Sequence, residues 1–222
     1  TSQPERSYPG VNLPTSINGN LYSYSVWIYV NDYTTAYGKY KNILSRSSYK
    51  GDTSSDKSGV TDISGSESPG LYLDKTMNKL IAYTSLIDDN KSKNVCEINN
   101  IPLNKWNHIV YVLNQNSVDL YLNGKLERSC VLSKLPDVKD TYQLYICKSG
   151  GYNGKVAQLQ YFTQALTPNN VTQLYNKGPT GSNKLLNSDN QFANVNYSQL
   201  KDDICSGNTS DIANIIKNQF NL

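Results

Sequence analysis

The sequence has few of the residues that build catalytic and metal centres, and no excess of charge of one sign. Its 222 residues include one histidine and four cysteines, and no cysteine stands in a Cys-x-x-Cys pair, which argues against a zinc site. The 21 Lys and Arg residues are interspersed with 18 Asp and Glu residues, so the formal net charge is only +3. Because a basic stripe is missing, we predict no nucleic-acid partner.

Long hydrophobic runs are also missing. No run approaches the roughly 18 apolar residues of a membrane span, and the N-terminal TSQPERSYPG has no apolar signal-peptide core. We therefore expect attachment to a membrane only through an anchor outside this chain. With 37% hydrophobic and 18% charged residues, the composition is typical of a globular protein. We expect one main domain, residues 1–179, followed by a polar linker and tail, residues 180–222.

Short runs in which apolar and polar residues alternate predict β-strands. The clearest runs from Leu21 to Val30, where side chains alternate with the period of two of a strand. Similar runs recur at Asn42–Ser47, Gly70–Leu73, Lys79–Ser85, Trp106–Leu113, Val118–Leu122, Leu126–Leu132, Tyr142–Cys147 and Lys155–Phe162. Their spacing, with turn residues between them, predicts an all-β sandwich.

Turn residues predict two hairpins. Asn123 and Gly124 separate two alternating segments, which is the strongest short-range hairpin signal. A second hairpin is expected across Lys75–Asn78. Between Ser47 and Pro69 lies a Ser-, Gly- and Asp-rich segment that is too long for an ordinary connection, and it is either a solvated loop or a ligand or ion site.

Helices are expected only near the C-terminal end. Thr167 followed by Pro168 is typical of a capped helix start, and Gly178 of its end. A second, amphipathic helix is predicted over Asp211–Phe220, capped by Ser210. This helical tail must pack on the sandwich or on a partner.

The four cysteines, an even number, favour a disulfide-bonded protein, and the sequence by itself leaves three pairings open. Four Asn-x-Ser/Thr sequons agree with an extracellular location. The set consists of Cys96, Cys130, Cys147 and Cys205.

Two stretches resemble a known superfamily. Cys96–Leu132, with CEINNIPLNKW and LYLNGKLERSC, resembles the signature of concanavalin A-like lectin/glucanase domains of the laminin-G and pentraxin-like type. Gly150–Pro179 resembles their closing strand and the short helix after it, and the likeness extends over about residues 13–179. In detail the sequence is most similar to the versions carried by large nucleocytoplasmic DNA viruses.

The resemblance implies an antiparallel jelly-roll sandwich that binds a ligand rather than catalysing a reaction. In the viral versions, the positions of Cys96 and Cys130 look like a bridge between neighbouring strands. The other two cysteines, Cys147 and Cys205, lie outside the family pattern, and we expect them to pair with each other.

The catalytic members of the superfamily carry a Glu-x-Asp-x-x-Glu array, which this chain lacks. Its four glutamates are Glu5, Glu67, Glu97 and Glu127. A glycosidase needs two carboxylates flanking the scissile bond, so we predict that the protein is not an enzyme. The single histidine, His108, is interpreted as a packed strand residue, and Trp27 and Trp106 as core residues.

Loop residues are the candidates for ligand binding. We expect contacts from Asp32, Tyr33, Tyr37 and Tyr40, because loop aromatic rings on a rigid sandwich can stack on sugars or protein partners. Some relatives bind calcium through loop oxygens. The calcium candidates here are Asp52, Asp56, Asp62, Asp88 and Asp89, with Asp32.

Two functions follow from these observations. The first is a noncatalytic, lectin-like module on a virion or cell surface that binds glycan or a surface protein. The alternative is a structural virion or capsid protein, in which the sandwich is a rigid block and the tail docks on neighbouring subunits. Deletion of Asp211–Leu222 separates the two, because only the second function requires that segment for assembly.

Overall fold

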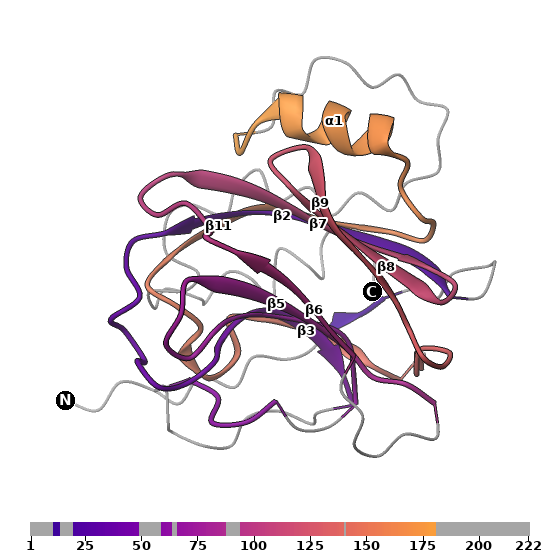
Figure 1. Ribbon diagram of the computed structural model, residues 1–222, viewed down its shortest axis with the longest axis horizontal. Coiled ribbons are helices and arrows are strands. Elements are labelled where there is room, and N and C mark those ends of the chain that lie inside the picture. The colour runs from indigo at the N-terminus through magenta and orange to yellow at the C-terminus, as the bar shows by residue number, and fades with distance from the viewer. Residues whose placement is uncertain are drawn as a thin grey trace.

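The computed structural model describes residues 11–13, 20–48, 59–63, 66–87, 94–139 and 141–180. Two antiparallel sheets pack face to face, and one α-helix lies over one of them (Figure 1). The predicted all-β jelly-roll sandwich with a short helix after the last strand is confirmed. The predicted tail helix lies outside the described residues, and the division between residues 179 and 180 stays a prediction.

The six-stranded sheet has the order β1-β10-β3-β4-β5-β6, and every neighbouring pair is antiparallel. Its strands are Val11–Asn12 (β1), Gln143–Ile146 (β10), Lys41–Ser47 (β3), Glu67–Leu73 (β4), Lys79–Thr84 (β5) and Asn94–Asn99 (β6). A 3-10 turn, η1, follows β10 at Lys148–Gly150.

The five-stranded sheet has the order β11-β2-β7-β8-β9 and is also antiparallel. Its strands are Gly154–Phe162 (β11), Leu21–Val30 (β2), Trp106–Asn114 (β7), Ser117–Leu122 (β8) and Lys125–Val131 (β9). Between β8 and β9, Asn123 and Gly124 adopt φ values of 51° and 81°. Two successive positive φ angles are those of a type I′ turn, which confirms the predicted hairpin.

The core lies between the sheets and is built from one face of each strand. In β2, for example, Tyr22, Tyr24, Val26 and Ile28 are almost fully buried and belong to one hydrophobic cluster. The period of two in the sequence thus reports which side chains face the opposite sheet. This cluster forms the rigid block on which the loops are mounted.

Three strands begin where the sequence predicts none. β1 and β6 were not predicted, and β4 starts at Glu67, inside the polar segment expected to be a loop. Part of the same polar segment packs on the outer face of the six-stranded sheet: Val60 and Ile63 join the cluster of Tyr72, Ile81 and Tyr83. The segment is therefore not uniformly solvated.

The helix α1, Pro168–Lys177, begins as predicted. The Thr167 hydroxyl accepts from the backbone N–H of Asn170, and the Asn170 side chain accepts from the backbone N–H of Thr167, which makes a capping box. The helix lies over the outer face of the five-stranded sheet (Figure 1). Its Val171 is buried in one cluster with Val110 and Val112. No helix in the described part of the chain is long and apolar enough to cross a membrane.

His108 is a packed strand residue, as predicted. It is buried, lies 2.8 Å from the Ser25 hydroxyl through Nε2, and its ring is 4.9 Å from the Trp27 ring. The helix adds Tyr175, which stacks on Trp27 at 5.6 Å. Trp27 is therefore buried, although beneath α1 rather than between the sheets. Trp106 differs from the prediction, since it is only half-buried, against Tyr29.

The buried His108 makes stability depend on pH. Burial lowers its pKa from 6.5 to about 4, so the unfolded chain takes up a proton at a higher pH than the folded chain does. The contribution of His108 to the free energy of unfolding thus falls as the pH drops from about 6.5 to 4, by about 3 kcal/mol in full. The free energies of unfolding of the wild type and of His108→Gln, measured in urea, should differ by that much less at pH 4 than at pH 7. Parallel pH profiles of the two proteins would contradict the prediction.

A disulfide joins Cys96 on β6 to Cys130 on β9, with Cα atoms 6.0 Å apart. Because β6 and β9 are the edge strands of the two sheets, this bond links the sheets along one side of the sandwich. The pairing implied by the family resemblance is confirmed. Cys147 is buried and disulfide-bonded. Its predicted partner, Cys205, lies outside the described residues, so that pairing stays a prediction.

Candidate functional site

Two segments meet at one end of the sandwich. The β2–β3 loop, residues 31–40, lies beside the β4–β5 turn, residues 74–78, and the backbone N–H of Gly38 donates to the carbonyl oxygen of Lys75 at 3.0 Å. We call these two segments the loop end. The tyrosines and the aspartate that the sequence predicts as ligand contacts all lie in the first segment.

Asp32 shapes the β2–β3 loop. One carboxylate oxygen accepts from the backbone N–H and hydroxyl of Thr34, at 2.9 and 2.8 Å, and from the backbone N–H of Thr35 at 3.2 Å. The other accepts from the side-chain amide of Asn153. The Thr34 hydroxyl makes the largest contribution to the lowered pKa of Asp32, so this carboxylate is charged at neutral pH. One of its oxygens is thus bonded within the loop and the other to Asn153, outside it.

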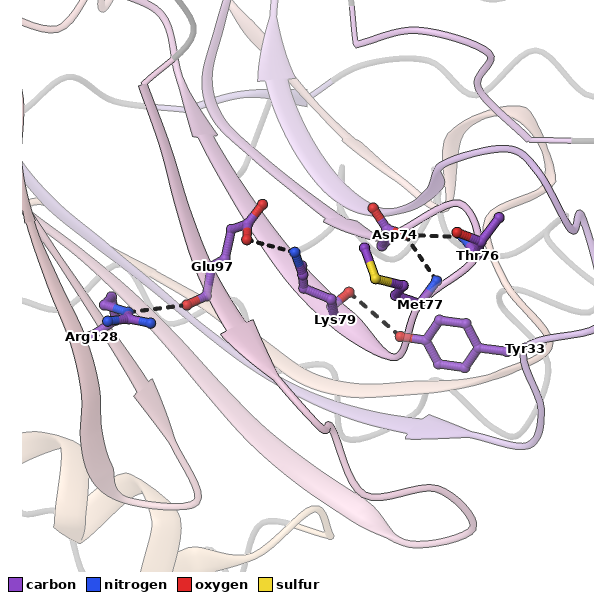
Figure 2. Close-up of polar contacts among 7 residues, drawn as sticks. All are labelled: Tyr33, Asp74, Thr76, Met77, Lys79, Glu97 and Arg128. Carbon is purple, nitrogen blue, oxygen red and sulfur yellow. Dashed lines mark hydrogen bonds and ion pairs between the residues drawn. The ribbon is translucent and has the colours of Figure 1, made fainter.

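Asp74 does the same for the β4–β5 turn. Its Oδ1 accepts from the backbone N–H groups of Thr76 at 3.0 Å and Met77 at 2.9 Å (Figure 2). Burial acts to raise the pKa of Asp74, but the hydrogen bonds from the turn backbone outweigh it, so the pKa lies below the usual value. The turn thus holds a charged carboxylate and presents Met77, which is 55% exposed.

An ion pair continues from this turn across the sheet edge. Lys79 Nζ lies 2.8 Å from Glu97 Oε2, and Arg128 Nε donates to the backbone carbonyl of Glu97 at 3.4 Å (Figure 2). These contacts connect β5, β6 and β9 beside the disulfide.

The three predicted tyrosines differ in exposure. Tyr37 is 69% exposed and presents its ring to solvent. Tyr33 is half-buried, and its hydroxyl donates to the carbonyl of Lys79 at 3.5 Å (Figure 2). Tyr40 is half-buried as well, with its ring 6.3 Å from the Tyr72 ring and 4.6 Å from Lys75 Nζ. Tyr37 is therefore the ring of the three best placed to stack on a ligand.

Lys41, the first residue of β3, was not predicted to take part. Its side chain is buried, and Nζ donates to the carbonyl oxygens of Lys39 and Asp74 at 3.2 Å and of Lys75 at 3.3 Å. The ammonium thus bonds to both segments of the loop end. A lysine beside an apolar strand usually indicates a solvated edge, so the sequence carries no signal for this role.

A buried charged group lies on the outer face of the six-stranded sheet. The Glu67 carboxylate is 2.8 Å from the Tyr72 hydroxyl through each oxygen, and Lys148 Nζ lies 3.7 Å from Oε1. Burial raises the pKa of Glu67, against the opposing effect of the Lys148 charge. A Cβ on Gly70 would overlap this carboxylate, so a larger residue there would have to displace it from Tyr72. The glutamate is enclosed rather than offered to a substrate.

Only some of the aspartates predicted as calcium ligands are described by the structure. Asp62 is described and exposed. Asp32 is described too, and its carboxylate is hydrogen-bonded as given above. Four candidates lie outside the described residues and stay predictions: Asp52, Asp56, Asp88 and Asp89. Within the described ranges, no three His, Cys, Asp or Glu side chains are grouped so that they could hold a metal ion.

The family is established by a direct match. The profile described as the Concanavalin A-like lectin/glucanases superfamily matches residues 6–172, more than half of the chain. The protein therefore belongs to this superfamily, as the sequence motifs indicate. No finding bears on a closer relation to the viral versions. A search of curated proteins gave no match.

Solved structures share the fold at low sequence identity. The botulinum neurotoxin serotype D binding domain superimposes with a TM-score of 0.52 at 15% identity, over 78% of this chain and 42% of that chain. The receptor binding domain of botulinum neurotoxin C/D mosaic serotype gives 0.52 at 14%, over 72% and 36%. A point mutant of HCR/D gives 0.54 at 17%, over 75% and 39%. This chain thus spans about two fifths of the length of those structures.

Proposed function

We propose that this domain is a noncatalytic, lectin-like module that binds a glycan or a surface protein through the loop end. The observation that carries the proposal is the exposed Tyr37 ring, mounted on a loop fixed by Asp32 and by Lys41 at the end of a rigid sandwich. Aromatic rings on preorganised loops bind at low entropic cost. Membership of a lectin-containing superfamily, and the binding domains among the structural neighbours, support it.

The absence of catalysis belongs to the same proposal. Two of the four glutamates are engaged with other groups: Glu67 is buried against Tyr72 and Lys148, and Glu97 pairs with Lys79. A retaining glycosidase would need two carboxylates facing one bond. The protein should therefore release no reducing ends from a polysaccharide panel, and measurable release would contradict this part of the proposal.

We also propose that the module works outside the reducing cytosol, on a virion or cell surface. The Cys96–Cys130 disulfide supports this location, since such bonds persist in oxidising compartments. The structural role of the tail in a capsid stays the alternative, because the tail lies outside the described residues.

The ligand site is tested by changing Tyr37. Because its ring supplies stacking area, Tyr37→Ala should weaken binding of an array-selected glycan about tenfold or more, measured by calorimetry. Tyr37→Phe retains the ring and should bind within about threefold of the wild type. Val131→Ala, an equally exposed apolar position on β9, is the control and should leave affinity unchanged. Unaltered binding by Tyr37→Ala would mean that the ligand site does not lie at the loop end.

A further inference from the structure

Lys41 is fully buried, which is rare for a lysine in a folded protein. Its side chain lies beneath the loop end with 0% exposure, and its ammonium group has three N–H donors. All three have a carbonyl acceptor within 3.3 Å, on Lys39, Asp74 and Lys75. The group is therefore fully hydrogen-bonded, which removes much of the cost of burying a charge.

The positions of the three acceptors indicate the structural role of Lys41. They come from two segments that are about 35 positions apart in the chain, and the ammonium draws them together. The Tyr33 ring also lies 5.3 Å from Lys41 Nζ, so the cation faces an aromatic ring as well. Loss of the ammonium would leave three carbonyl oxygens facing one another.

Convergent loop carbonyl oxygens are ligands that calcium prefers, and calcium is the ion that the family resemblance implies for such loops. Here the residues do not fit that ion. The carbonyl oxygens are bonded to Lys41, and the carboxylates of Asp32 and Asp74 accept hydrogen bonds from their own turns. A divalent cation would have to displace a covalently tethered ammonium from these carbonyl oxygens.

We propose that Lys41 is a positioning residue that supplies the cation of the loop end, so that both segments are held, and ligand is bound, without a metal ion. The part that concerns ligand rests on the function proposed above. The part that concerns loop order does not, because it can be measured on the protein alone.

The first test uses the wild-type protein. Amide hydrogen exchange reports local opening, and three amides sample the loop end: Gly38, which donates to Lys75, and Thr76 and Met77, which donate to Asp74. Their exchange rates should be equal in millimolar calcium and in chelator. Slowing of these amides by calcium, by about tenfold or more, would overturn the proposal, whatever happens elsewhere in the chain.

The second test removes the charge. Lys41→Met keeps the unbranched apolar part of the side chain and removes only the ammonium end. Exchange at Gly38, Thr76 and Met77 should then accelerate about tenfold or more, because charged hydrogen bonds to both segments are lost. Amides in the middle of β7 should keep their protection. Lys125→Met, on the exposed edge strand β9, is the matched control. Unchanged exchange at the three amides in Lys41→Met would overturn the proposal.

Global unfolding of Lys41→Met would leave the calcium comparison on the wild type as the decisive measurement. Glycan binding by the wild type, measured in calcium and in chelator, is a third readout, independent of the two exchange measurements. Glycan binding that is lost in chelator would contradict metal independence while leaving the lectin-like function intact. If the wild type bound no glycan, the proposed function would fail, yet the exchange results would still decide the role of Lys41.

Discussion

Replacing Cys96 and Cys130 together by serine should lower the free energy of unfolding by about 3 to 4 kcal/mol. The bond closes a loop of 34 residues, and in the chain-entropy model this loop size gives that range. The position of the disulfide adds to the effect, because the bond joins the edge strands β6 and β9 of opposite sheets. Urea denaturation of the oxidised wild type and the double variant measures the difference.

Reductant provides the control for this prediction. In its presence the wild type loses the same bond, so the two proteins should unfold at nearly the same urea concentration. A difference below about 1 kcal/mol between the oxidised wild type and the variant would mean that the sheets are held together without the bond.

Gly154→Ala is expected to destabilise the protein by about 3 kcal/mol or more. Gly154 opens β11 and pairs with Val30, and an added Cβ would overlap the carbonyl oxygen of Tyr29 and the ring of Tyr152. Neither can move easily, since one is strand backbone and the other is a fully buried core ring. Overpacking of this kind forces strands apart. Thermal and urea unfolding give the magnitude.

Gly38→Ala is the matched comparison for Gly154→Ala. Gly38 has φ of +79°, but nothing lies within 4 Å of its Cβ position, so the cost should be limited to about 1 kcal/mol of backbone strain. Equal destabilisation by the two variants would show that the close approach of β11 to β2 is looser than described here.

Much of the fold could be predicted because its signals are local. The Asn123-Gly124 turn needs only two residues that tolerate positive φ, and the α1 cap needs only Thr167 before a proline. The alternation in β2 follows from one face meeting the other sheet. The Cys96–Cys130 bond, by contrast, came from the family resemblance, since the residues by themselves allow three pairings.

The predictions of strand position and burial fail where contacts between residues far apart in the chain determine the structure. Glu67 begins a strand because it pairs with Ser47 on β3, and nothing near it in the sequence indicates that partner. Trp106 looks like a core residue by its position in an alternating run, but it is the first residue of β7 and is half-buried.

The candidate site was only partly predictable for the same reason. The loop could be located from its tyrosines, but which ring is exposed depends on neighbours: Tyr33 is held by Lys79 and Tyr40 by Tyr72, leaving Tyr37. The role of Lys41 depends on carbonyl groups about 35 positions away, which no sequence pattern indicates.

The measurement that tests the central claim most directly is a glycan array probed with the wild type and with Tyr37→Ala, each in calcium and in chelator. The account predicts selective binding by the wild type that is equal in both conditions and is lost or strongly reduced in Tyr37→Ala. An array on which the wild type binds nothing, or on which Tyr37→Ala binds as the wild type does, would contradict a lectin-like site at the loop end.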